Sequence, residues 1–254
     1  MLSFLRTRST LLSRTVEVGW LIDTDKAGFI WEEPKRLMRE PPSTLHAKSV
    51  RYCPAVLDHD ARLFEVSSPI DLCLRVTLGS EKEPPRLINA AGDKSTIRPK
   101  YLGEMVHLIP RKEWRHPDRP ILQIFTPYLF VADEPVYMTQ FPPFSHFRSS
   151  TLPGLMIGGR FPIHIWPRHL MWAFEWYDQK QNLTLQRGEP WFYVRFETQD
   201  PSRSVRLVET EITPQLREYI TGVRGITNYV NRTFSIFATA RSRRPKKVVI
   251  PKKR

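Results

Sequence analysis

Proline interrupts this chain so often that most helical folds are excluded. The sequence holds 23 prolines and 11 glycines in 254 residues, and the prolines fall mostly between apolar runs. Because an interior proline removes a helical hydrogen bond and clashes with the preceding turn, long helices are excluded from most of the chain. The apolar runs are therefore expected to form short strands.

Alternation of apolar and polar residues supports this expectation. Residues 70–78 place five apolar side chains at every second position, which is the period of a strand with one buried face. The spacing of such runs, about ten residues, predicts a mainly β fold with a sandwich-like or barrel-like body. Residues 33–50 and 79–100 are predicted to be long loops. Strands are also predicted at 16–22, 28–32, 105–109, 121–126, 128–131, 136–140, 155–160, 163–166, 169–177, 183–186 and 191–197.

A helical pattern replaces the strand pattern near residue 212. Thr213 is suited to cap a helix whose first position is Pro214. Gly222 and Gly225 weaken the middle and are expected to split the helix in two. The segment is expected either to cap the β body or to form an oligomer contact. Its apolar stripe is predicted to contain Leu216, Ile220, Val223, Ile226, Val230, Phe234 and Phe237.

Positive charge is concentrated at the two ends of the sequence. Of the net +13, the last fourteen residues carry +8 and the first fourteen carry +3, so residues 15–240 carry only +2. The predicted organisation is a basic arm (1–14), a β domain (15–211), a helical segment (212–240) and a basic tail (241–254). The tail is expected to contact nucleic acid or an acidic protein, with a solvated arm as the alternative. Its basic residues are Arg241, Arg243, Arg244, Lys246, Lys247, Lys252, Lys253 and Arg254.

The N-terminal arm allows two interpretations. It is rich in Arg, Ser and Leu and has no acidic residue before Glu17, which is typical of organellar transit peptides and also of an ordinary basic arm. No run approaches eighteen consecutive apolar residues, so a membrane-spanning segment is not expected.

Motifs for catalysis or cofactor binding are scarce. The sequence lacks the glycine-rich loops that cradle nucleotide phosphates and the G-x-S-x-G of serine hydrolases. Cys53 and Cys73 are predicted to be reduced, buried thiols because their spacing fits neither a zinc ribbon nor a redox motif. The aromatic strand at 191–197 is expected to bury one face, and its other face is expected to pack or to stack on bases. No catalytic residue and no cofactor is predicted.

One metal pattern remains as an alternative. His116 and Asp118 form an H-x-D, followed by His164 and His169 and then by Arg187. This order resembles the two-histidine, one-carboxylate triad of iron(II) and 2-oxoglutarate oxygenases, whose arginine would hold the cosubstrate carboxylate. Pro117 in the middle position instead favours an exposed turn.

Several short motifs resemble an uncharacterised domain family of marine bacteria and tailed phages. They are Cys53-Pro54, the TPYLF of residues 126–130, Pro142-Pro143 and the R-G-E-P of residues 187–190. The resemblance spans residues 53–197 and implies no established activity.

A second resemblance concerns a fold. The G-G-R-F-P of residues 158–162, the run 169–177, the R-G-E of residues 187–189 and the R-S-S of residues 148–150 are similar to the closing part of deoxyuridine triphosphatases and other β-clip proteins. Gly159, Arg160 and Phe161 stand where that family has its aspartate and tyrosine, so the water-activating base is missing. The resemblance implies a β-clip-like fold without the hydrolase chemistry.

These observations favour a non-enzymatic structural or interaction protein. The resemblance to phage proteins implies a virion component that contacts copies of itself and other structural proteins, and nucleic acid through its basic tails. Phe141, Phe144 and Phe147, in the apolar loop FPPFSHF, are expected to contact a partner. The alternatives are the oxygenase, in the cytoplasm, and an organellar assembly or ribosome-associated protein.

Overall fold

The computed structural model describes residues 15–24, 28–38, 52–79, 83–95, 97–146 and 151–253. Strands dominate this part of the chain, which confirms the predicted mainly β class. The strands are β1 (Thr15–Ile22), β2 (Lys35–Arg36), β3 (Leu63–Ser67), β4 (Leu72–Thr77), β5 (Arg86–Asn89), β6 (Val106–Leu108), β7 (Ile121–Phe125), β8 (Tyr128–Ala132), β9 (Val136–Phe141), β10 (Gly154–Ile157), β11 (Arg160–Phe161), β12 (Met171–Trp176), β13 (Leu183–Leu185), β14 (Pro190–Thr198) and β15 (Ser204–Glu209).

The two largest sheets pack against each other and form a sandwich-like body. Their strand orders are β11-β9-β14-β3-β2 and β10-β12-β7-β6. Trp172 of β12 and Trp191 of β14 meet across the interface with ring centroids 6.0 Å apart. The side chains of β9 alternate in burial, as expected for a strand with one face towards the core. Val136, Met138 and Gln140 are buried on one face, and the residues between them are half-buried.

A third sheet, β15-β1-β8, is covered on both faces. β1 pairs with β15 in parallel and with β8 in antiparallel register. All five residues of β8 are buried: Tyr128 and Phe130 face the main core, whereas Leu129 and Val131 face a second core. A strand buried on both faces needs apolar residues at every position, and β8 meets that requirement. A fourth sheet has the order β13-β4-β5.

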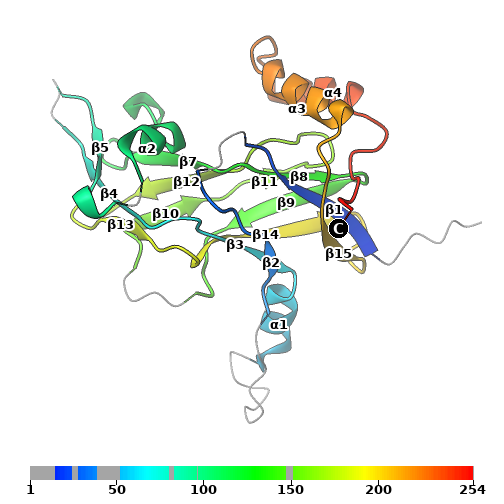
Figure 1. Cartoon of the computed structure of the whole chain (residues 1–254), viewed down its shortest axis with the longest axis horizontal. Helices are drawn as coiled ribbons and strands as arrows, with labels where there is room; N and C mark the ends of the chain where they lie inside the picture. The colour runs from blue at the N-terminus through cyan, green and yellow to red at the C-terminus, as the bar shows by residue number, and fades with distance from the viewer. Residues whose placement is uncertain are drawn as a thin grey trace, which may run out of the picture.

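Helices lie outside the sheets. They are α1 (Pro54–Asp60), α2 (Pro99–Met105), α3 (Pro214–Ile226) and α4 (Thr233–Ser242), with short 3₁₀ turns at Gly92–Lys94 and Arg111–Glu113. Figure 1 shows α1 projecting from one side of the sheets, while α3 and α4 lie on the opposite side. Within the described ranges, no helix is both long and apolar enough to cross a membrane.

The second core joins α3 and α4 to the β body. The Thr213 hydroxyl accepts a hydrogen bond from the Leu216 amide, so the predicted cap is confirmed. Tyr219 donates a hydrogen bond of 2.8 Å to the Ile165 carbonyl, and burial raises the pKa of its hydroxyl to about 12. Val223 and Ile226 are also buried. The helical segment therefore caps the β body, which is one of the two arrangements expected from the sequence.

The helical segment is divided into two helices, as predicted, but the break does not fall at the predicted glycines. α3 runs through Gly222 and Gly225, and the break follows at residues 227–232. Packing of Val223 and Ile226 in the second core outweighs the weak helix propensity of the two glycines. Phe234 is a further correction, because its side chain is 86% exposed and does not belong to the buried stripe.

Two predicted strands are turns or irregular chain. Residues 163–166 form a turn in which the Ile165 and Trp166 amides both bond to the Pro162 carbonyl. This turn places Ile163 in the main core and Ile165 in the second, which explains its apolar sequence. The predicted strand 28–32 is likewise not a strand in the structure.

Other segments that the alternation missed are now visible. β5 lies inside the predicted loop 79–100, and the pattern also gave no indication of α1, α2, β3 or β15. Both faces of β14 are buried, so its aromatics present no surface on which bases can stack. Cys53 and Cys73 are free thiols, as predicted, but both are only half-buried.

Candidate interaction surfaces

An exposed aromatic cluster lies beside α1. β9 ends at Phe141, and the Phe144 amide bonds to the Pro142 carbonyl in the turn that follows. The Phe144 side chain is 51% exposed, which is unusual for a large apolar ring. Phe147, the third predicted contact, lies outside the described residues.

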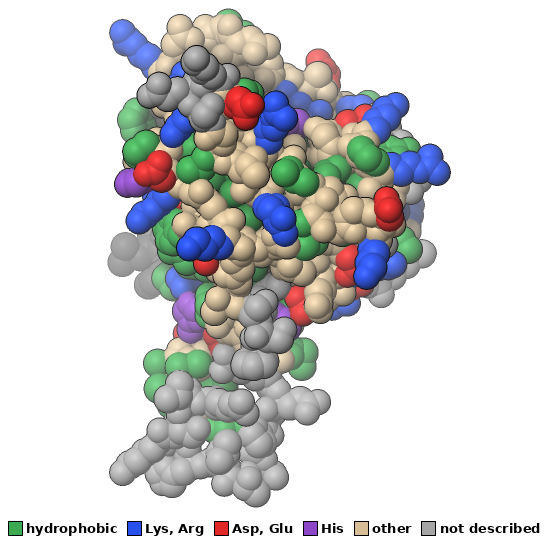
Figure 2. Space-filling view, turned by 90° about the vertical axis from the view of Figure 1, so that its left-hand side faces the viewer, with side chains coloured by type: hydrophobic (Ala, Val, Ile, Leu, Met, Phe, Trp, Pro, Cys, Tyr) green, Lys and Arg blue, Asp and Glu red, His purple; other side chains and the backbone are tan. Residues whose placement is uncertain are grey.

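Rings from three segments hold Phe144 in place. Its centroid lies 5.4 Å from that of Tyr193, 5.6 Å from that of His59 on α1, and 6.4 Å from that of Phe141. Leu57, also on α1, is partly exposed. We call Leu57, His59, Phe141 and Phe144 the α1 surface. Figure 2 shows hydrophobic and histidine side chains around the α1 projection at the lower end of the molecule. The structure therefore brings two of the three predicted contact residues into one preorganised patch.

The predicted basic tail is not a free arm over its described length. Val248 and Val249 are buried in the second core. Their amides donate to Asp133 Oδ1 at 2.7 and 3.3 Å. Farther along, the Lys252 amide bonds to the Glu209 carbonyl and its ammonium pairs with the Glu209 carboxylate at 2.7 Å. The alternative of a solvated arm is therefore wrong for residues 243–253.

Arg244 is the residue that locks this segment to the β body. Its guanidinium donates to the carbonyls of His164 (2.6 Å), Ala132 (2.9 Å), Asp133 (3.0 Å) and Pro245 (2.9 Å). The side chain is 15% exposed, so Arg244 serves folding rather than a partner. The predicted tail residues that remain exposed are Arg241, Arg243, Lys246, Lys247, Lys252 and Lys253, of which Lys252 pairs with Glu209, while Arg254 lies outside the described residues.

A charged cluster attaches α3 to the β body. Asp23 follows β1, His169 precedes β12, and Arg224 lies on α3. His169 Nε2 is 3.0 Å from Asp23 Oδ2, and Arg224 Nη2 is 3.0 Å from His169 Nε2 and pairs with the Asp23 carboxylate. Arg217 Nη1 lies 3.7 Å from Asp23 Oδ1. Two arginines therefore offset part of the negative charge of Asp23, which itself raises the pKa of His169.

This cluster makes stability depend on pH. Burial lowers the pKa of His169, and the charge of Arg224 lowers it further, against the opposing effect of Asp23. Burial also lowers the pKa of His164. Because the unfolded histidines have a pKa of about 6.5, the unfolded chain takes up protons first as the pH falls. The free energy of unfolding is expected to be highest above that pH and to decrease as the pH falls through about 6.5 towards the folded pKa values.

Urea unfolding at a series of pH values measures this dependence. His169→Gln is expected to lower stability at neutral pH and to flatten the slope below pH about 6.5, because it removes one of the two histidines whose pKa is lowered by burial in the folded state. A slope in the variant equal to that of the unaltered protein would contradict this assignment.

The predicted metal ligands are dispersed. The His116 ring accepts the Asp118 amide at 3.2 Å, which is the exposed turn that Pro117 favours. His164 Nδ1 lies 3.0 Å from the Val136 carbonyl, and His169 belongs to the charged cluster. Within the described ranges, no group of three His, Cys, Asp or Glu side chains is placed to hold a metal ion.

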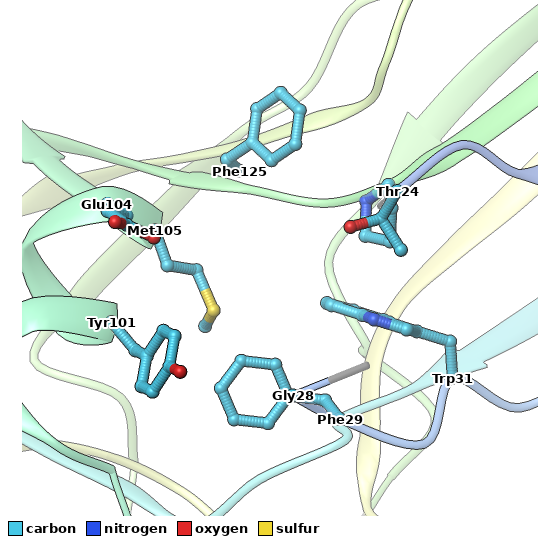
Figure 3. Close-up of a pocket in the computed structure, with 9 residues that line it drawn as sticks. Thr24, Gly28, Phe29, Trp31, Tyr101, Glu104, Met105 and Phe125 are labelled. Carbon is cyan, nitrogen blue, oxygen red and sulfur yellow. The ribbon is translucent and has the colours of Figure 1, made fainter. Parts of the chain in front are cut away.

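An aromatic pocket of about 170 Å³ lies between α2 and the segment 28–31 (Figure 3). Phe29 and Trp31 stand nearly perpendicular, with centroids 6.2 Å apart and an interplanar angle of 86°. The pocket is mostly apolar, so it suits a small apolar group. Its lining consists of Thr24, Gly28, Phe29, Trp31, Tyr101, Glu104, Met105, Phe125 and Pro127.

Comparison with protein-family models and with curated proteins finds no match to this chain. The resemblances to a phage and marine-bacterial family and to β-clip proteins therefore stay predictions, and the R-S-S of residues 148–150 lies outside the described residues. The fold defines a mainly β protein with α1 projecting on one side and the basic segment of α3 and α4 on the other.

Proposed function

We propose that this chain is a non-enzymatic structural protein that assembles with copies of itself and with other structural proteins, as a component of a tailed-phage virion. The observation that carries the proposal is the α1 surface, where Phe144 is half-exposed yet fixed by three neighbouring rings. Aromatic side chains, phenylalanine included, are enriched at the core of protein interfaces relative to the rest of the surface. The exposed residues of the basic tail support a second contact, with packaged nucleic acid or an acidic protein neighbour.

Self-association is the first test. Sedimentation equilibrium is expected to show oligomers, and Phe144→Ser is expected to weaken the association by about tenfold or more because an interface anchor is lost. Leu155→Ser is the matched control, because Leu155 is 55% exposed on β10 and is expected to leave the association unchanged. A protein that stays monomeric up to about 100 µM, or equal association of both variants, would contradict self-assembly through the α1 surface.

Virion membership is tested separately. Purified particles of the source phage are expected to contain the protein at a fixed copy number, and its absence from them would contradict the proposed location. The organellar alternative depends on residues 1–14, which lie outside the described residues. It predicts that these residues are missing from the mature protein.

A further inference from the structure

The C-terminal helical unit combines strong positive charge with exposed aromatic rings. Residues 212–253 contain ten Lys and Arg residues and one acidic residue, Glu218, so they hold +9 of the net charge of +13. We propose that this unit binds single-stranded nucleic acid through stacking on Tyr229 and Phe234. The proposal deepens the nucleic-acid contact of the proposed function and rests on it. It names the type of nucleic acid and adds stacking on Tyr229, in the turn after α3, and on Phe234, on α4, to the charged contact of the predicted tail.

The two rings are exposed although the apolar face of α4 is already satisfied. Phe237 packs edge-on against Trp166 at 5.4 Å, and Ala240 is fully buried. Phe234 and Tyr229, by contrast, are 86% and 55% exposed. Neither ring is needed to complete the second core, so both are available to a planar ligand.

Arginines accompany both rings. The Arg243 guanidinium lies 5.6 Å from the centroid of the Tyr229 ring. Arg232, immediately before α4, and Arg241, in the last turn of α4, are both exposed. Arg224 and Arg244 lie in the same unit, but they are engaged with Asp23 and with backbone carbonyls. The exposed arginines therefore supply phosphate contacts, while the engaged arginines keep the unit attached to the β body.

The pattern favours unpaired bases over a duplex or a membrane. Exposed rings stack on bases that are free of a partner, and the neighbouring cations follow the phosphate backbone. A duplex hides the faces of its bases and would use only the charges. A helix lying in a membrane surface needs a continuous exposed apolar face, whereas Ile236 and Phe237 of α4 pack against the second core and leave Phe234 isolated.

The test measures binding of the full chain to labelled oligonucleotides by fluorescence anisotropy. The probes are single-stranded DNA and RNA of about 20 nucleotides, a duplex of the same DNA sequence, and vesicles rich in phosphatidylglycerol. The single strands are expected to bind at least about tenfold more tightly than the duplex, because only they offer stacking. Tyr229→Ala with Phe234→Ala is expected to remove that preference and to leave the salt dependence unchanged.

Charge variants separate this inference from the proposed function. Arg241→Gln with Arg243→Gln is expected to weaken both single strands and duplex and to reduce the slope against log salt by about 1.4 to 1.8. Leu155→Ala is the control for folding and surface change. Equal affinity for single strands and duplex, or an unchanged preference in the aromatic variant, would overturn the inference and leave the charged contact standing. Tight vesicle binding that is lost with Phe234→Ala would also overturn it, in favour of a membrane contact. Failure of every probe would remove the nucleic-acid contact itself, while self-association through the α1 surface is tested independently.

Discussion

Replacing Trp172 with alanine is expected to lower the free energy of unfolding by about 3 to 5 kcal/mol. The Trp172 side chain is fully buried in β12, stacks on Phe174 with centroids 5.0 Å apart, and contacts Trp191 of the facing sheet. Its removal opens a cavity between the two large sheets, where surrounding aromatic rings collapse poorly. Urea unfolding followed by circular dichroism measures the change.

Leu155→Ala provides the comparison, because that side chain lies on the surface of the neighbouring strand β10. We expect a change within about 0.5 kcal/mol. A loss in Trp172→Ala no larger than that of the control would mean that the two sheets do not pack as described.

Replacing Arg244 with alanine is expected to cost about 2 to 4 kcal/mol, because carbonyls at the edge of the second core lose their donor. Three of these carbonyls belong to Ala132, Asp133 and His164, in segments far from Arg244 in the sequence. Arg244→Lys is expected to restore only part of the stability, because an ammonium does not reproduce the planar fork of the guanidinium.

Arg241→Ala is the matched control, since it removes the same side chain from an exposed position three residues earlier. Its expected change is within about 0.5 kcal/mol. Hydrogen exchange adds a local readout: the amides of Val248 and Val249 are expected to lose protection in Arg244→Ala and to keep it in Arg241→Ala. Equal destabilisation by the two substitutions would contradict the locking role of Arg244.

The same contacts change how the basic segment must be studied. Deleting residues 241–253 would remove Val248 and Val249 from the second core along with the positive charges. Loss of nucleic-acid binding in such a deletion would then report unfolding as well as lost charge. Single substitutions at the exposed positions avoid that ambiguity.

Local pattern predicted the strands well where one face is buried. The alternation at residues 70–78 predicts β4, and similar runs predict β7, β9 and β12 with errors of a few residues at their ends. The cap at Thr213 was also predicted, because capping depends on side chains within one turn. The sequence did not predict that the rings of Tyr229 and Phe234 are both exposed. The available signal was that Tyr229 and Phe234 flank Arg232 in a stretch without acidic residues.

Composition and period were enough to establish a mainly β body, a C-terminal helical unit and the concentration of charge near the chain ends, because these depend on neighbouring residues. Tertiary structure decided which charges remain available. Arg243 and Arg244 are adjacent and chemically identical, yet one extends over an exposed tyrosine and the other is surrounded by carbonyls of distant segments. The same applies to Phe144 and Phe234, whose exposure follows from the packing around them. Burial and partner choice depend on contacts between residues far apart in the chain, and a local pattern does not contain that information.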